Sequence, residues 1–324
     1  MRMKTEKRPA PIGYANAGGL RNLPRNLAVD LRRNAGLYLI MLPILLWFLV
    51  FCYAPMFGLG MAFERFTPGK GFFASPWVGL QNFRNFFESI YFLRLIRNTL
   101  VLGLLDLAIG FPAPILLALM LNELRSKAFK RTVQTISYLP YFISTVILCG
   151  LIVLFVQSGG AISNLLVGFT GGKSVNLLGN GDSFRLVFVL SGVWQFVGYG
   201  SIIFMAALSA IDHEQYEAAV IDGAGRWKQL LHVTLPGIMP TVIVLLILKM
   251  SSLLSVASDK ILLLYSPAIY EKADVIGTYV YRVGIINMDY GYSAAVGLFN
   301  SVVATILLLS INAISRRFSE SSLF

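Results

Sequence analysis

Six long apolar stretches constrain this chain more than any other feature of its sequence. The first, residues 34–63, contains no charged side chain, and it exceeds the roughly 20 apolar residues that a helix needs to cross a bilayer. The other stretches cover residues 98–121, 132–156, 186–208, 237–258 and 291–314. Helices satisfy their own backbone hydrogen bonds in lipid. The sequence therefore predicts an all-α, polytopic membrane protein with six transmembrane helices.

The composition agrees with a membrane protein rather than a soluble one. Of the 324 residues, 56% are apolar and only 13% are charged, and the mean hydropathy is +0.70. A net charge of +11 would suggest nucleic acid as a partner of a soluble chain. In a chain that crosses lipid, the same charge is better explained as loop charge that orients the helices, so no nucleic-acid partner is expected.

Few residues suggest a metal or redox site. Cys52 and Cys149 both lie within apolar stretches, which indicates neither a disulfide framework nor a thiolate metal site. His213 and His232 are the only histidines, and they are too far apart for a helical ligand pair. We expect no metal or cofactor to be bound by this chain.

The basic residues lie in alternate segments between the apolar stretches. These segments are an amino-terminal arm (1–33), a short loop (122–131), a central loop (209–236) and a tail (316–324). Cytoplasmic loops carry an excess of Lys and Arg, so both termini and the central loop are predicted to be cytoplasmic. The arm has no apolar core of the signal-peptide kind and is expected to be mostly disordered.

The central loop is the longest helical segment that is not predicted to cross the membrane. Asp212, followed three residues later by Gln215, is typical of a helix start. Apolar or small residues recur from there at helical spacing, namely Tyr216, Ala219, Val220, Gly223, Trp227, Leu230 and Leu231. An amphipathic helix lying on lipid is the alternative, but such helices favour Lys and Arg on the polar face. The polar side of this segment centres on acids, namely Glu214, Glu217 and Asp222. This composition favours a short helix docked in the groove of a partner.

The same loop carries a family resemblance. Glu217-Ala218-Ala219, then Asp222-Gly223, and finally Leu235-Pro236 with Pro240 resemble the loop of permease subunits of binding-protein-dependent ABC importers, in the sugar-importing branch. The resemblance implies that this loop is a coupling helix seated on an ATPase subunit. The implied ATPase-coupling residues are Glu217, Ala218, Ala219, Asp222 and Gly223.

Two further stretches are similar to the same family. Residues 77–83, WVGLQNF, resemble the first external loop of sugar-importer permeases, and residues 258–302 resemble permeases for oligosaccharides and polysaccharide fragments, the alginate importer among them. The resemblance implies a bacterial cytoplasmic membrane location. It also implies several partners: a second related permease subunit, a dimer of ATPase subunits that bind ATP and Mg, an extracytoplasmic solute-binding protein, and the carbohydrate.

One stretch imitates a nucleotide-binding motif. Residues 168–174, GFTGGKS, place three residues between the outer glycines, whereas a phosphate-binding loop needs four so that its amides can wrap the phosphates. No strand is predicted before it, and its loop is predicted to be external. We therefore expect this chain not to be an enzyme by itself but to depend on a partner that hydrolyses ATP.

Six residues at membrane depth are candidates for the substrate pathway. Lys249 lies within the fifth stretch, where a charge is costly unless it faces water or an acid. It could contact a sugar carboxylate, pair with Asp106, or extend toward the interface. The other candidates are Trp194, Gln195, Tyr199 and Asn300. Aromatic and amide groups of this kind bind sugars, but each of them could equally be a contact between helices.

Three classes of function were compared on these grounds. A permease subunit of an ATP-driven importer of oligosaccharides or polysaccharide fragments explains the central loop, the six spans and the missing nucleotide motif. The positive charge of Lys249 favours an acidic, alginate-like cargo. A secondary transporter or channel for a polar solute is the alternative, although it leaves the Glu217 loop unexplained. No paired carboxylates, metal cluster or nucleophile and base indicate a membrane enzyme.

Overall fold

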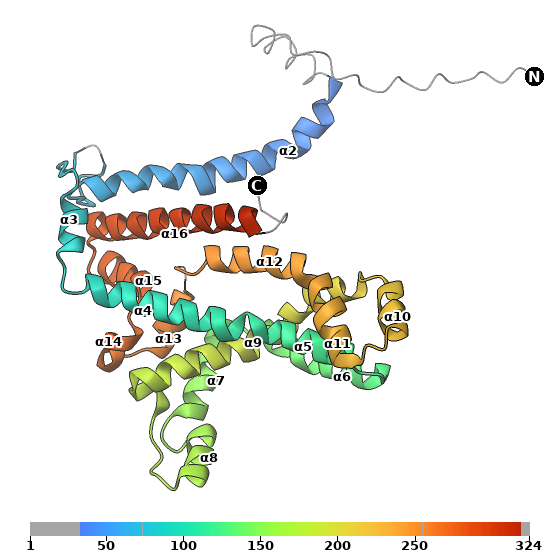
Figure 1. Cartoon of the computed structure of the whole chain (residues 1–324). Helices are drawn as coiled ribbons and strands as arrows, with labels where there is room; N and C mark the ends of the chain where they lie inside the picture. Colours follow the sequence, from blue (N-terminus) through green and yellow to red (C-terminus); the bar gives the residue numbers. More distant parts are fainter. Residues whose placement is uncertain (1–32, 73, 255, 319–324) are drawn as a thin grey trace, which may run out of the picture. The chain divides into compact units, whose positions relative to one another are not determined.

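The computed structural model describes residues 33–72, 74–254 and 256–318, which are drawn in colour in Figure 1. Within these residues the regular elements are helices, together with one isolated β-bridge between Glu64 and Trp77. The chain divides into two compact units, residues 1–58 and 59–324. Nearly all of the predicted amino-terminal arm and most of the predicted tail lie outside the described residues.

Among the described residues, six helical segments are long and apolar enough to cross a membrane, as predicted. They are Ala35–Phe63, Phe92–Asn122, Thr145–Phe169, Gly181–Ser209, Arg226–Met250 and Tyr290–Ala313. The first segment combines α2 (Ala35–Phe48), the π-helical η2 (Leu49–Tyr53) and the 3-10 helix η3 (Ala54–Phe63). The all-helical fold and the number of spans are thereby confirmed.

The third span begins later than the sequence suggests. Residues 132–156 were expected to form one helix, but α6 (Lys127–Tyr138) and the 3-10 turn η5 (Leu139–Phe142) precede a break, after which α7 (Thr145–Val156) begins. Ser144 has an extended backbone, and its hydroxyl accepts a hydrogen bond from the Ile147 amide at 3.4 Å. Such a residue starts a new helix. The span continues into α8 (Ala161–Thr170), within a segment that was predicted to be a loop.

The helix that contains the fifth span begins earlier than predicted, at Arg226 rather than 237. The helices α11 (Arg226–Gln229), η7 (Leu230–Thr234) and α12 (Leu235–Ser251) follow one another directly. Pro236 directly follows the π-helical η7; a proline removes one helical hydrogen bond, and here it coincides with a local irregularity of the helix rather than with its end. The carboxyl-terminal part of the predicted central loop is therefore continuous with the span.

Helix α9 (Gly181–Ser209) packs against several other helices of the second unit. Two glycines allow this close packing. A Cβ atom at Gly198 would collide with the backbone of Ser137 in α6, and a Cβ at Gly200 would lie 3.0 Å from Pro114 in α5 (Pro112–Asn122). Phe184 and Phe188 of α9 belong to the largest buried apolar cluster. The glycines thus let helices approach as closely as membrane helices require.

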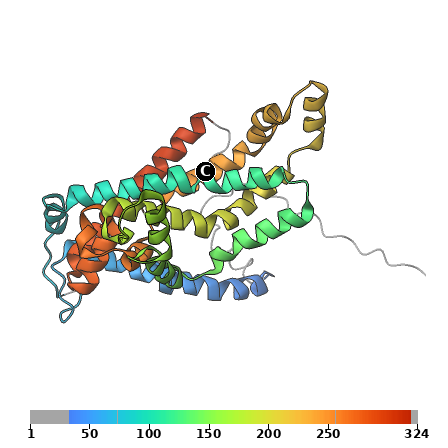
Figure 2. The ribbon, with the colours of Figure 1, turned by 90° about the horizontal axis from the view of Figure 1, so that it is seen from below.

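Several short helices lie at the two ends of the second unit. Figures 1 and 2 agree that α10 (His213–Ile221) and α11 lie at one end, with α3 (Gln81–Phe87), α14 (Tyr270–Ala273) and α15 (Ile276–Tyr281) at the other. The elements between and around them are α4 (Phe92–Leu105), η4 (Asp106–Gly110), η6 (Leu177–Gly179), α13 (Ser258–Leu264), η8 (Pro267–Ile269), η9 (Arg282–Ile286) and α16 (Tyr290–Phe318).

Candidate functional site

The central loop folds as a helix, a tight turn and a second helix. Asp212 caps α10 by accepting a hydrogen bond from the Glu214 amide at 3.0 Å, as expected for a helix start. The helix ends before Gly223, whose φ of +74° is a backbone conformation that favours glycine. The Ala224 amide then donates to the Ala219 carbonyl at 2.8 Å. A tight turn at Gly223 therefore separates α10 from α11.

The outer surface of this loop is apolar and exposed. Ile221 is 86% exposed, Trp227 is 77% exposed and Val220 is 60% exposed. The exposed Glu217 carboxylate has no ion-pair partner within the described residues. At the base of the loop the hydroxyls of Tyr216 and Thr234 share a hydrogen bond of 3.0 Å, and Arg226 Nη1 of α11 lies 4.0 Å from Glu123 Oε2. Large exposed apolar groups beside an unpaired acid are typical of a protein-binding surface.

A second candidate site is a cavity between α4, η4, α9 and α12–α13. Its volume is about 260 Å³. The charged side chains that line it are Asp106, Lys249 and Lys260, and its aromatic walls are Phe188 and Phe196. The cavity brings together three stretches that are far apart in the sequence, residues 103–107, 188–196 and 249–260.

Asp106 and Lys249, the two charges predicted at membrane depth, form an ion pair in this cavity. Lys249 Nζ lies 2.5 Å from Asp106 Oδ2. Asp106 begins the π-helical turn η4, a type of helix defect that occurs frequently at functional sites. Asp106, which the sequence suggested as one possible partner of Lys249, is thus its partner in this structure. Both side chains also line the cavity.

Lys260 is the residue of this cavity that sequence reasoning missed. It is 5% exposed. Its Nζ donates a hydrogen bond to the Phe188 carbonyl at 3.1 Å and lies 5.1 Å from the centroid of the Phe188 ring. The sequence does contain a signal for this residue, because Lys260 directly precedes the apolar run Ile261–Leu264. Only the packing of α13 against α9 shows that it reaches the cavity of Asp106 and Lys249.

The other predicted pathway residues occupy separate surroundings. Gln195 is buried, and its Nε2 donates to the Ile143 carbonyl at 3.2 Å, which joins α9 to the connection between α6 and α7. Trp194 lines a different, mainly apolar cavity of about 620 Å³ between α7, α8 and α9. Tyr199 stacks on Tyr141 with ring centroids 3.8 Å apart. Asn300 has a buried Oδ1 without a hydrogen-bond partner among the described residues. A role for these four in transport stays a prediction.

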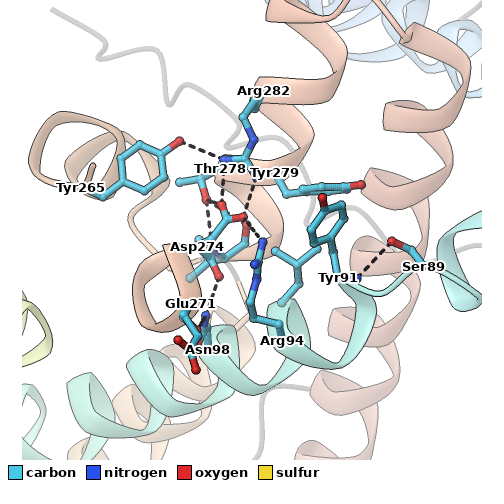
Figure 3. A network of polar contacts seen from close by, with 12 residues as sticks. Ser89, Tyr91, Arg94, Asn98, Tyr265, Glu271, Asp274, Thr278, Tyr279 and Arg282 are labelled. Carbon is cyan, nitrogen blue, oxygen red and sulfur yellow. Dashed lines mark hydrogen bonds and ion pairs between the residues drawn. The ribbon is translucent and has the colours of Figure 1, made fainter. Parts of the chain in front are cut away.

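A buried ionic network lies at the end of the unit opposite the central loop (Figure 3). The Asp274 side chain is completely buried and accepts hydrogen bonds from Arg282 Nη2 at 2.6 Å and Nη1 at 3.1 Å. Arg94 Nη2 donates to Asp274 from 3.3 Å, and Thr278 Oγ1 donates from 2.8 Å. The network connects α4 to the segment between α14 and η9.

Neighbouring polar groups extend this network to α9. Asn98 Nδ2 donates to the carbonyls of Glu271 at 2.9 Å and Asp274 at 3.0 Å, while its Oδ1 accepts from Arg185 Nη2 at 2.7 Å. Burial by itself would lower the pKa of Arg282, but the hydrogen bonds and charge of Asp274 outweigh it and raise that pKa. The arginine is therefore firmly cationic, and the network holds three helical segments together.

Comparisons with known proteins show which family the chain is similar to. The family described as "Binding-protein-dependent transport system inner membrane component" matches residues 110–320. "Protein LplB" of Bacillus subtilis (strain 168) is 43% identical over 320 residues, covering 98% of each chain. The "Polygalacturonan/rhamnogalacturonan transport system permease protein YteP" of the same organism is 42% identical over 301 residues, covering 93% of this chain and 94% of that protein.

The fold is also similar to that of a chain of known structure. A crystal structure of a bacterial ABC transporter involved in the import of the acidic polysaccharide alginate contains a chain that superposes with a TM-score of 0.85 at 43% identity. The match covers 91% of the present chain and all of the other. A chain of a bacterial alginate ABC transporter in complex with an alginate pentasaccharide-bound periplasmic protein matches with a TM-score of 0.84 at 42% identity.

Proposed function

The chain belongs to the family of binding-protein-dependent transport system inner membrane components, and from this premise we propose that it imports oligosaccharides or polysaccharide fragments by alternating access. It is the permease, a non-catalytic transmembrane component of an ABC importer. The cargo, the pathway residues and the residues that couple transport to ATP hydrolysis are the proposed parts of this function.

One observation carries the coupling proposal. The α10–α11 loop exposes a tryptophan, two aliphatic side chains and the unpaired Glu217 carboxylate at one end of the second unit. A carboxylate on a docked helix gains strength when its cationic partner is shielded from water. We assign Glu217, Ala218, Ala219, Asp222 and Gly223 to the contact with an ATPase subunit. A secondary transporter or channel has no ATPase subunit that would bind such a surface.

The proposed mechanism follows from this attachment. An extracytoplasmic binding protein delivers the sugar to loops 64–97 and 259–290, and ATP with Mg closes a dimer of ATPase subunits on the cytoplasmic side. The α10–α11 loop moves with that dimer, and the helices rock to open toward the outside, after which hydrolysis resets them. A second, related permease subunit completes the pathway. We assign both termini to the cytoplasm, because the segments that contain them are rich in Lys and Arg.

The proposed cargo class rests on the cavity and on the relatives. Polygalacturonan, rhamnogalacturonan and alginate are named for two of the similar transporters, and the present cavity holds two lysines. Opposite charges attract strongly in a site that water scarcely enters. An acidic oligosaccharide is therefore the cargo that we assign to this permease.

The coupling assignment is tested by substitutions in the turn. Glu217→Ala removes the docking carboxylate, and Gly223→Ala forces a side chain into a left-handed conformation that costs about 1–2 kcal/mol. Both variants are expected to retain membrane assembly but to lose most of the binding-protein-stimulated ATP hydrolysis, measured on the complete importer in liposomes.

Gly225→Ala is the matched control for the backbone effect. Its φ is −68° and a Cβ there meets nothing within 4 Å, so hydrolysis should stay at the wild-type level. Wild-type stimulation in both Glu217→Ala and Gly223→Ala would refute the assignment. Labelling of Trp227→Cys from the extracytoplasmic side of intact cells would refute the orientation on which it depends.

A further inference from the structure

The cavity that contains Asp106 has one surplus positive charge. Two ammonium groups, those of Lys249 and Lys260, line it together with the single carboxylate of Asp106. Lys249 holds that carboxylate at 2.5 Å. Among the described residues, no carboxylate lies within ion-pairing distance of Lys260, whose one close polar contact is the Phe188 carbonyl at 3.1 Å.

Lys260 is therefore an incompletely compensated cation. An ammonium group has three donors, and only one is used by the Phe188 carbonyl. With 5% of the residue exposed, water cannot replace the missing acceptors freely. A buried charge without its partners is costly. An anionic group entering the cavity would relieve that cost.

The shape of the cavity fits one sugar unit. Its volume of about 260 Å³ lies just below the roughly 300–1,000 Å³ of typical ligand pockets, which suits a single ring rather than a whole chain. Phe188 and Phe196 belong to its lining; Phe188 is buried, while the half-exposed Phe196 offers an apolar ring on which a sugar packs. Gly192 lies beside the ammonium group, and a Cβ there would make ordinary van der Waals contact with Lys260 Nζ at 3.7 Å.

We propose that this cavity binds the carboxylate of one uronic-acid unit, with Lys260 as the residue that selects acidic over neutral sugars. The inference rests on the proposed function, because it specifies the substrate chemistry of the same transport pathway. Lys249 and Asp106 neutralise each other at one side of the cavity, and Lys260 supplies the charge that the sugar carboxylate meets. Lys260 is thus a specificity-determining residue of the permease.

The test uses the complete importer in liposomes and two probes. One probe is a uronic-acid trisaccharide, and the other is the same trisaccharide with its carboxylates reduced to alcohols, each at a concentration that saturates the binding protein. Lys260→Met is expected to lower uronate uptake about tenfold or more, as expected when one partner of a buried charge pair is removed. Uptake of the reduced sugar should stay within about twofold of wild type, because it does not need the charge.

A second substitution neutralises Lys260 without removing it. Gly192→Asp places a carboxylate beside Lys260 Nζ and is expected to lower uronate uptake like Lys260→Met. Gly192→Asn adds the same bulk without charge and should keep the preference for uronate. Comparison of Gly192→Asp with Gly192→Asn tests the role of the Lys260 charge even if the Lys260→Met protein does not assemble.

The outcomes separate the inference from the function on which it rests. An unchanged ratio of uronate to neutral uptake in Lys260→Met or in Gly192→Asp overturns the inference. So does an equal loss of both sugars, because a purely structural lysine would produce it. A wild-type importer that takes up neither sugar would instead refute the proposed cargo class.

Discussion

Replacing Asp274 by asparagine should destabilise the second unit strongly. The Asp274 side chain is completely buried and is contacted by Arg282 Nη2 at 2.6 Å and Arg94 Nη2 at 3.3 Å. It also accepts the Thr278 hydroxyl at 2.8 Å. Asparagine keeps the size of the side chain but removes its charge. The two guanidinium groups would then face each other without a counter-charge.

The expected magnitude follows from burial. Removing one partner of a buried ion pair costs about 3–5 kcal/mol. The arginine side chains remain 27% (Arg94) and 20% (Arg282) exposed, so water would screen part of the repulsion. The lower end of the range applies, and we expect a loss of about 3 kcal/mol in the free energy of unfolding.

The assay is denaturant unfolding of the purified protein in mixed micelles, followed by circular dichroism. Asp259→Asn is the matched control, because this exposed acid at the start of α13 contributes less than about 1 kcal/mol through the helix dipole. The double variant Asp274→Leu with Arg282→Met removes both charges and should cost less than the sum of the two single changes. A loss below about 1 kcal/mol for Asp274→Asn would refute the reasoning.

Two further substitutions test the helix packing and the central ion pair. Gly198→Ala would push a methyl group into the Ser137 backbone and should lower the free energy of unfolding by about 1–3 kcal/mol. Gly150→Ala is the control, because a Cβ there meets nothing within 4 Å, and it should lower the stability less. Equal melting temperatures of the two variants would contradict the close approach of α6 and α9. Lys249→Met should impair uptake because it leaves Asp106 without its partner, and adding Asp106→Leu should recover part of the loss. Uptake unchanged by Lys249→Met would exclude a role for this pair.

Local features of the fold could be predicted from the sequence because they depend on neighbouring residues. The number of spans follows from the length of each apolar run, a property that no distant contact changes. The same holds for the start of α10 at Asp212 and for its end at Gly223, since a cap and a left-handed glycine act within a few residues. The break before α7 was missed because Pro140 and Ser144 lie within a run whose hydropathy indicates a continuous span.

The charged clusters depended on the tertiary structure instead. Lys249 had several possible partners in the sequence, and only the packing of α12 beside η4 shows that Asp106 is the one it meets. Arg94 and Asp274 are 180 residues apart. No local pattern encodes which helices lie next to each other, because that choice is made by the fit of their surfaces. The chain's own sequence therefore determined that it crosses a membrane six times and where its central loop turns, while packing decided which buried charges meet.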